Sequence, residues 1–340
     1  MVKQYAVGID VGGTKILAGV VEVNSGQVVS TARKRTYPER GADFFTERLL
    51  TVVQEAITAA NLSAKTELAG VGIGIAGQVD RDNGILLSGP NLGVGLNNLP
   101  VAHLLHERFQ MPVVVGNDVE VATRGEQVYG AARECDDFVC VFVGTGIGSG
   151  IVQGGQLYRG ASGTAGELGH TVVQFGGRLC GCGGRGHLEA YASRSAVTRV
   201  LLAELMRGRK SLLQELVDPD DKVIRSKVIA RCLDEGDELV TEAMTEAADY
   251  LGVGLGSLIT FYNPKRLVLG GGLIEATQLL FDRASARARE VALPGPGRLV
   301  EIVRTELGDN AGIVGAAQLS VSAAHAAPQQ VAHDTAASAS

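Results

Sequence analysis

Apolar and polar positions at the start of the chain alternate in blocks that predict strands followed by a helix. Apolar runs over residues 4–10 and 16–23 predict two buried strands, and residues 27–36 can pair as a third. From Phe45 the apolar residues recur every three to four positions, which predicts a helix that Asp43 could cap. The chain therefore opens as an α/β protein.

The rest of the chain continues this mixture of strands and helices. The same spacing predicts strands over residues 68–79, 111–115, 137–143, 151–158, 266–269 and 299–304. It predicts helices over residues 101–109, 119–129, 241–262 and 311–321. Residues 322–340 are rich in Ala, Ser, Gln and His without periodicity, which predicts a disordered tail.

A pattern of strand, glycine-rich loop and second strand occurs twice in the chain, over residues 5–23 and again over residues 137–158. This repetition indicates an internal duplication, with two α/β domains facing each other across a cleft. We expect a smaller domain of residues 1–118 plus 311–321, and a larger domain of residues 119–310.

Composition favours a small-molecule enzyme of the cytoplasm. The 340 residues carry a formal net charge of −6 and no Trp, which argues against nucleic-acid binding and against a base-stacking platform. No signal peptide or membrane-spanning run is expected, because the first strand begins almost at once and the apolar runs are short. Five cysteines give no even-numbered disulfide framework, so a reducing compartment is expected.

Two glycine loops follow predicted strands and could bind phosphate through backbone N–H groups. Neither loop has the spacing of a Walker A motif or of a dinucleotide fingerprint, and tight hairpins without a ligand are the alternative. Their corresponding positions in the two halves favour phosphate binding. The candidate contacts are Gly12, Gly13, Thr14 and Lys15 in the first loop and Gly144, Thr145 and Gly146 in the second.

Two acids stand at the ends of predicted strands, where ligands bind in α/β proteins. Asp10 precedes the first glycine loop and could hold Mg²⁺ through water, or it could cap a turn. Asp118 could accept a proton from a substrate hydroxyl that Asn117 orients, or it could cap the helix that follows.

Residues 167–189 gather metal-binding side chains between two acids. The candidate ligands are His170, Cys180, Cys182 and His187. Four protein ligands would close the shell of a tetrahedral zinc ion, so the metal would be structural. A redox pair of Cys180 and Cys182, or a surface loop without metal, are the alternatives. Glu167 and Glu189 bracket the cluster and are suited to bind a polyhydroxylated ligand.

In this order, the motifs resemble those of the ROK family of sugar kinases and repressors, within the actin-like ATPase superfamily. The resemblance spans residues 4–321 and implies two ribonuclease H-like α/β domains around a cleft. It rests on Asp10–Lys15, GIGIAGQVD (72–80), PNLG (90–93), Asn117–Asp118, GTGIGSG (144–150), ELGH (167–170), CGCGGRGHLE (180–189), NPKRLVLGGG (263–272) and GDNAGIVGAA (308–317).

The resemblance implies an enzyme that uses ATP and Mg²⁺ to phosphorylate a hexose, most closely glucose, at its 6-hydroxyl, and that holds a structural zinc. Asp118 matches the catalytic base, and Gly270, Gly271 and Gly272 match the region near the adenosine. His170 would direct one ring nitrogen to zinc and the other to the sugar. The positions that match sugar contacts are Gly77, Asn91, Asn117, Asp118, Glu167, His170 and Glu189.

Three positions depart from the family pattern. His187 stands where a third cysteine is usual, so we expect a zinc site of two Cys and two His ligands. Val94 stands where Trp often follows the PNLG motif, and Glu120 replaces a frequent Asn. Both of these lie on the sugar side, so they leave the identity of the hexose open.

Other functions within the same family stay open. Fructose or an N-acetylhexosamine could be the substrate, and polyphosphate could be the donor, although relatives that use it generally lack the cysteine motif. A non-catalytic sugar-binding regulator is a further alternative. A repressor would need a winged helix, for which the few residues before the first strand leave no room. We expect a homodimer or homotetramer, without nucleic-acid or membrane partners.

Overall fold

Two compact units make up the chain in the computed structural model, which describes residues 4–62, 67–89, 92, 95–218 and 223–326. The first unit runs to Gly130 and resumes at Asn310, and the second unit lies between them. The division thus falls later than residue 118, the boundary expected from the sequence. The reason is that helix α3 (Asp118–Tyr129) packs against helix α12 (Ala311–Ala326) of the first unit.

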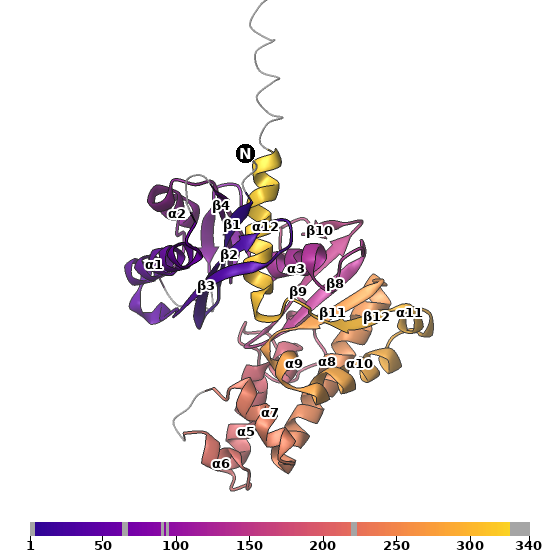
Figure 1. The fold of residues 1–340 in the computed structure, drawn as a ribbon. Coiled ribbons are helices and arrows are strands. Elements are labelled where there is room, and N and C mark those ends of the chain that lie inside the picture. Colours follow the sequence, from indigo (N-terminus) through magenta and orange to yellow (C-terminus); the bar gives the residue numbers. More distant parts are fainter. Residues whose placement is uncertain (1–3, 63–66, 90–91, 93–94, 219–222, 327–340) are drawn as a thin grey trace, which may run out of the picture. The chain divides into compact units, whose positions relative to one another are not determined.

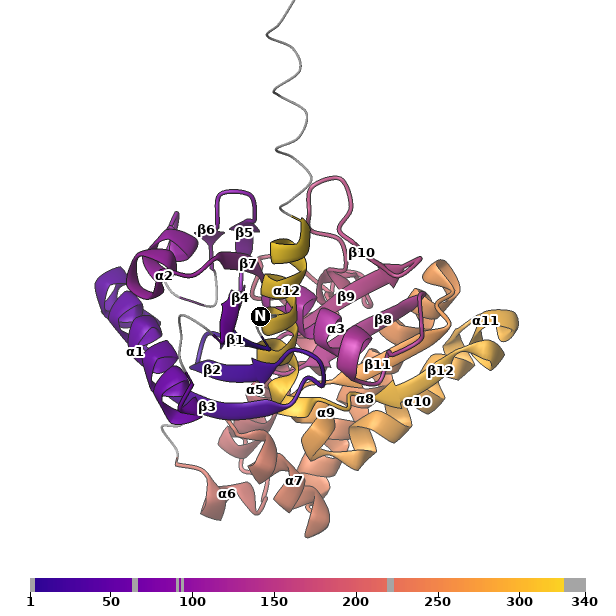
Figure 2. The same cartoon turned by 45° about the horizontal axis from the view of Figure 1, so that its top comes forward.

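The first unit is built on a five-stranded sheet. In sheet order its strands are β3 (Val28–Arg35), β2 (Lys15–Glu22), β1 (Tyr5–Val11), β4 (Leu68–Ile75) and β7 (Val113–Asn117). β1 and β2 form an antiparallel hairpin that β3 extends, whereas β4 and β7 run parallel to β1 (Figure 2). The three strands expected before the first helix are therefore confirmed.

Helix α1 (Ala42–Ala60) covers β2 and β3 with the apolar stripe that begins at Phe45, as its spacing predicted. Asp43 does not cap this helix. The N-cap residue is Gly41, and Asp43 lies in the first turn instead, where its negative charge suits the helix dipole. Helix α2 (Val101–Phe109) has the bounds expected from the sequence.

The strand expected over residues 68–79 is two separate elements. β4 ends at Ile75, and β5 (Gln78–Asp80) pairs with β6 (Ile85–Ser88) in a small hairpin of its own. The break falls at Gly77, whose φ of 138° is in the region that favours glycine. A Cβ atom at Gly77 would also lie 2.2 Å from the carbonyl oxygen of Ser88.

Helix α12 lies directly on the backbone of the first sheet (Figure 1). A Cβ atom at Gly8 of β1 would lie 1.7 Å from the carbonyl oxygen of Ile313, and one at Gly72 of β4 would lie 1.7 Å from that of Ala316. The glycines of both strands are therefore required for this packing. The helix continues to Ala326, beyond residue 321, where the tail was expected to begin.

The second unit repeats the topology of the first. In sheet order its strands are β10 (Gln156–Tyr158), β9 (Ile147–Gln153), β8 (Phe138–Val143), β11 (Arg266–Gly270) and β12 (Glu301–Arg304). Again an antiparallel hairpin, β8–β9, is extended on one side, and β11 and β12 run parallel to β8. The expected duplication is therefore present in the strand order and in the strand directions of both sheets.

The second glycine loop is shorter than its sequence suggests. Because β9 begins at Ile147 and pairs with β8, only Gly144–Gly146 form the turn. The strand expected over residues 151–158 is accordingly the end of β9 followed by β10. Each sheet thus has its glycine turn at the same place, between the two strands of the central hairpin.

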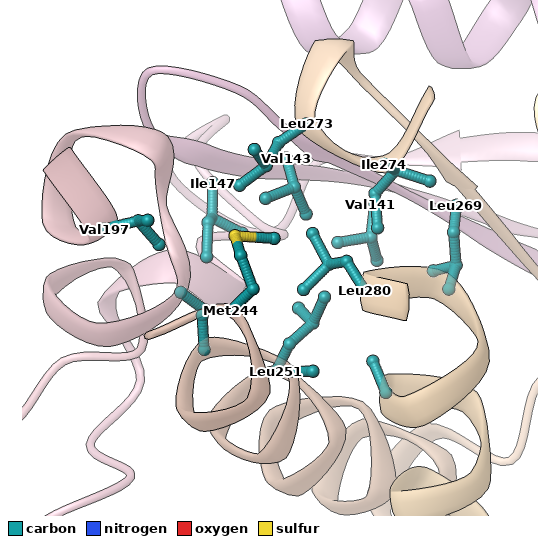
Figure 3. Packing of buried hydrophobic residues seen from close by; sticks show 14 of the residues in the cluster. Val141, Val143, Ile147, Val197, Met244, Leu251, Leu269, Leu273, Ile274 and Leu280 are labelled. Atoms are coloured by element: carbon teal, nitrogen blue, oxygen red, sulfur yellow. The ribbon is translucent and has the colours of Figure 1, made fainter. Parts of the chain in front are cut away.

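Helices cover one face of the second sheet and enclose the larger core. Val141 and Val143 of β8 and Leu269 of β11 pack against Met244, Leu251 and Leu280 of the helices (Figure 3).

The helices of both units are too short or too polar to cross a membrane, as far as the described residues extend. The described helices of the second unit are α4 (Glu189–Ala192), α5 (Arg194–Met206), α6 (Leu213–Leu216), α7 (Ser226–Asp234), α8 (Glu238–Tyr262), α9 (Gly272–Ala276), α10 (Gln278–Val291) and α11 (Pro294–Leu299).

The close packing of α12 predicts a large difference between two glycine substitutions. Gly72→Ala should lower the free energy of unfolding by about 3 kcal/mol or more, because a backbone carbonyl would have to move to admit the methyl group. Gly295→Ala in α11 should have little effect, because open space surrounds that position. Urea denaturation followed by circular dichroism measures both, and equal stabilities would contradict this account of the packing.

Candidate active site

The carboxyl ends of β1, β4 and β7 bring two acids together in the first unit. Asp10 pairs with Gly74 in the sheet register, Gly74 pairs with Gly116, and Asp118 follows one residue after the end of β7. Gly74 of β4 has no side chain that would separate Asp10 from Asp118, and a Cβ atom at Gly74 would lie 3.3 Å from the Cα of Asp118. The two carboxylates therefore interact across β4.

Asp118 has a strongly raised pKa. Burial is the main cause and the negative charge of Asp10 is the second, and together they raise the pKa of Asp118 to about 7. Hydrogen bonds from the backbone of Val119 and from Asn117 oppose the shift without cancelling it. A carboxyl group with this pKa exchanges protons readily near neutral pH, which suits a general base.

Asn117, not Asp118, caps helix α3. The Oδ1 atom of Asn117 accepts hydrogen bonds from the backbone N of Val119 at 3.0 Å and of Glu120 at 3.3 Å. Its Nδ2 atom donates to the carbonyl oxygen of Gly77 at 3.1 Å. The alternative capping role for Asp118 is thereby excluded, and the side chain of Asp118 is left for other chemistry.

The first glycine turn connects Asp10 to β2. The Nζ atom of Lys15 lies 3.8 Å from the Asp10 carboxylate, and the backbone N of Gly12 donates to the carbonyl oxygen of Lys15 at 2.9 Å. Thr36 is fully buried and binds the outside of the turn: its hydroxyl donates to Gly12 O at 2.7 Å, and its backbone N donates to Thr14 O at 3.2 Å.

The second glycine turn is held by the start of helix α5. The backbone N of Arg194 donates to Gly144 O at 2.8 Å, and the hydroxyl of Ser195 donates to Thr145 O at 2.7 Å. Gly271, with φ of 90°, lies against the backbone of Val143, immediately before the turn. The strand ends of β8 and β11 and the glycines 270–272 are thus gathered at one edge of the second sheet.

The four candidate metal ligands come together in the second unit. Their ligand atoms all lie within 4.8 Å of one another. Cys180 Sγ is 3.8 Å from His170 Nδ1, and Cys182 Sγ is 3.2 Å from His187 Nδ1. A tetrahedral zinc ion with bonds of about 2.0–2.3 Å separates its ligands by roughly 3.3–3.8 Å. The donor set and its spacing therefore fit a zinc ion.

Glu167 and Glu189 contact this cluster in different ways. Glu167 is exposed, and one of its carboxylate oxygens lies 3.9 Å from His170 Nε2, the ring nitrogen that faces away from Cys180. Glu189 is less exposed. Its Oε2 accepts a hydrogen bond from the backbone N of Ile147 at 2.9 Å, and its Oε1 lies 3.8 Å from Cys180 Sγ.

Known proteins match the chain over nearly its whole length. The model of the ROK family matches residues 6–323. The chain belongs to the ROK family.

Its relatives include sugar kinases and repressors. A glucokinase of Thermotoga maritima is 32% identical over 94% of this chain and 98% of its own length. A ROK family glucokinase from Streptomyces griseus, solved in complex with glucose and AMPPNP, superposes with a TM-score of 0.81 at 34% identity, over 94% of this chain and 99% of that one. A xylose repressor of Bacillus subtilis is 28% identical over 92% of this chain and 75% of its own length.

In this ROK protein, each unit brings together its own set of candidate residues. The first unit gathers Asp10, the first glycine turn, Gly77, Asn117 and Asp118. The second unit gathers the second glycine turn, glycines 270–272, the metal cluster and both glutamates. Asn91 of the PNLG motif lies outside the described residues, as does Val94.

Glu120, one of the departures from the family pattern, has a defined partner in this ROK protein. Arg81 donates from Nη2 at 2.6 Å and from Nε at 3.2 Å to its two carboxylate oxygens. This bidentate pair connects the β5–β6 hairpin to the first turn of α3, next to Asp118. The substitution thus contributes a fixed contact near the acidic edge.

The cysteine-containing loop is anchored by contacts outside the Cys/His cluster. Arg178 donates to both oxygens of Glu246 in α8 at 2.9 Å, and its backbone N donates to the Tyr191 hydroxyl at 2.7 Å. The Tyr191 ring stacks on Tyr250 with centroids 4.1 Å apart. Residues that anchor the site, such as Thr36, Tyr191 and Arg194, are not identifiable from local sequence because their contacts are long-range.

The raised pKa of Asp118 predicts a pH-dependent effect of Asp118→Asn on stability. Because the folded protein holds this proton up to about pH 7 and the unfolded chain loses it near 3.8, wild-type stability falls as pH rises through that window. Asp118→Asn removes this loss. Its stability relative to wild type should therefore increase by at most about 1.4 kcal/mol per pH unit between pH 4 and 7.

Thermal and urea unfolding of both proteins at several pH values measures this difference. Asp43→Asn, which removes an exposed carboxylate of α1, is the matched control, and its difference from wild type should change much less with pH than that of Asp118→Asn. An equally small change for Asp118→Asn would contradict the raised pKa of Asp118.

Proposed function

We propose that this ROK protein is an ATP-dependent kinase that phosphorylates the 6-hydroxyl of a hexose, with glucose as the preferred sugar. The observation that carries the proposal is Asp118, a partly buried carboxyl group with a pKa raised to about 7 at the end of β7. The similarity to glucokinases over more than nine-tenths of the chain supports glucose over other hexoses.

Asp118 is the proposed general base. It accepts the proton of the 6-hydroxyl as that oxygen attacks the γ-phosphorus of ATP, and the bond from that phosphorus to the bridging oxygen of ADP breaks. Its pKa lets it be ionised before the attack and hold the proton afterwards. Asn117 fixes the backbone that follows the base by capping α3, and it also binds the carbonyl oxygen of Gly77 in the turn after β4.

The two glycine turns are the proposed phosphate-binding elements. In the first, Gly12, Gly13, Thr14 and Lys15 offer backbone N–H groups, a hydroxyl and a positive charge. Asp10 would hold Mg²⁺ through water, and the ion would supply charge neutralisation to the phosphate groups. In the second unit, Gly144, Thr145 and Gly146 form the corresponding turn, and Gly270, Gly271 and Gly272 would lie near the adenosine.

The proposed sugar contacts come from several elements. His170 of the metal cluster, Glu167 near its ring and Glu189 near Cys180 present polar groups suited to sugar hydroxyls. Gly77 and Asn117 contribute from the first unit, and Asn91 is proposed from its motif alone. Because Glu189 Oε2 accepts from Ile147, the proposed sugar contact is its Oε1, which lies 3.8 Å from Cys180 Sγ.

Zinc is the proposed structural metal of the loop. His170, Cys180, Cys182 and His187 would hold it with all four positions filled by protein, so that the ion stabilises the loop and takes no part in the reaction. The Glu167 carboxylate lies 3.9 Å from Nε2 of His170, and a shorter approach on metal binding would fix the ring tautomer that presents Nδ1 to the metal.

A panel of hexoses with ATP tests the proposed activity. Glucose should give ADP release with the highest kcat/KM, and fructose, mannose and N-acetylhexosamines should be poorer. Asp118→Asn should lower kcat by roughly 10²–10⁴-fold, because the base is lost, while glucose binding measured by calorimetry stays within a few-fold of wild type.

Asp43→Asn serves again as the matched control and should keep full activity. Turnover of no hexose, together with sugar binding, would favour a non-catalytic sugar-binding regulator. Equal loss of binding and turnover in Asp118→Asn would assign that residue a structural role.

Elemental analysis tests the metal assignment. The purified protein should contain about one zinc per chain. His187→Cys should retain the metal because thiolate is an equally good ligand, whereas His187→Ala should lose most of it. Cys232→Ala, which changes a buried cysteine outside the loop, is the control and should keep its zinc. A metal-free wild-type protein with full activity would exclude a structural zinc.

A further inference from the structure

Arg194 stands beside the second glycine turn at the first position of helix α5. Its Nη2 atom donates to the hydroxyl of Thr145 at 2.7 Å, and its backbone N donates to Gly144 O. Ser193 caps the helix by accepting from the backbone N of Ala196. The guanidinium group is therefore held at the turn by a fixed helix start.

The charge of Arg194 is not matched by a carboxylate. Within the described part of the chain, its side chain makes the single hydrogen bond to Thr145, and its Nε atom is buried with no acceptor. Glu189, which also touches this turn, accepts from Ile147 instead. The Arg194 side chain is partly buried, and this burial lowers the pKa of the guanidinium group.

Arg178 in the same unit shows the ordinary arrangement. Its guanidinium group is also partly buried, and its Nη1 atom, like Nε of Arg194, is buried without an acceptor. The difference lies in the counter-charge, because Nη2 of Arg178 donates to both carboxylate oxygens of Glu246 and the group lies over the Tyr191 ring. A partly desolvated cation without a carboxylate partner is costly, so its position beside the second glycine turn points to an anion that arrives from outside.

The neighbouring groups define the chemistry of that anion. The Thr145 hydroxyl is exposed, and in the described structure the backbone N–H groups of Thr145 and Gly146 donate to no acceptor. Together with the guanidinium fork, they form a cluster of donors around one exposed turn. Phosphate oxygens suit such a cluster because arginine binds them through paired hydrogen bonds.

We propose that Arg194 binds the phosphate chain of the nucleoside triphosphate as a further phosphate-binding residue of the second glycine turn. This inference rests on the proposed function. The site needs no rearrangement, because the hydrogen bond to Thr145 already directs the guanidinium group to the turn. In the absence of nucleotide, Arg194 contributes an unfavourable desolvated charge, and the nucleotide compensates it.

Calorimetry with AMPPNP, ADP and adenosine tests the proposal. Arg194→Met, which keeps the apolar stem and removes the charge, should weaken AMPPNP binding by roughly 10- to 100-fold and leave adenosine and glucose binding unchanged. Arg194→Lys should recover part of the loss. Arg199→Met, which removes an exposed arginine of the same helix, is the matched control and should bind AMPPNP as wild type does.

Two further measurements separate phosphate binding from a structural role. Arg194→Met should melt at the same temperature as the nucleotide-free wild type or higher, since an uncompensated charge is removed; a lower melting temperature would contradict the proposal. If Arg194 only positioned Thr145, Thr145→Val would weaken AMPPNP binding equally, and the double variant would be no worse. We expect the double variant to bind more weakly than either single variant.

The outcomes also distinguish this proposal from the proposed function. A wild-type protein that binds no AMPPNP would overturn the kinase assignment itself. Wild-type binding that Arg194→Met leaves unchanged would overturn only the role of Arg194.

Discussion

The packing of helix α12 against bare backbone is the constraint on which the first unit depends. Because Gly8 and Gly72 carry no side chain, the helix lies directly on β1 and β4. Its Gly315 meets the backbone of α3 with equal closeness, since a Cβ atom there would lie 1.6 Å from Val121 O. One helix therefore fixes the strand that carries Asp10 near its end and the helix that begins with Asp118, and this arrangement holds the two carboxylates near each other.

Much of this architecture was predictable because it follows from local periodicity. The strand–turn–strand repeat indicated the duplication, and both sheets share the same order and strand directions. The boundary between the units was not predictable in the same way. Helix α3 follows β7 without a break, and only its long-range contact with α12 assigns it to the first unit. The strand break at Gly77 was also not predicted, because the apolar pattern of β4 continues past this residue.

The candidate site shows the same limit. Cys180, Cys182 and the two histidines could be grouped from sequence because three of the four lie within one short loop and their chemistry is distinctive. The hydrogen bond from Ile147 N to Glu189 could not be predicted, because the two residues come from different elements. It connects the metal loop to the second glycine turn. A Cβ atom at Gly146 would lie 2.4 Å from Glu189 Oε2, so a side chain at this position would displace the carboxylate from this hydrogen bond.

The two glycine turns occupy equivalent places but differ in their electrostatics. At the first turn, Lys15 is close to the Asp10 carboxylate, so positive and negative charge lie together before any ligand arrives. At the second turn, the nearby carboxylate of Glu189 is held by a backbone amide, and Arg194 is left without a counter-charge. A duplicated turn can therefore diverge through the residues that hold it from outside, Thr36 in one unit and the start of α5 in the other. Since the turns themselves remain short and glycine-rich, the difference in charge lies in elements that sequence motifs do not include.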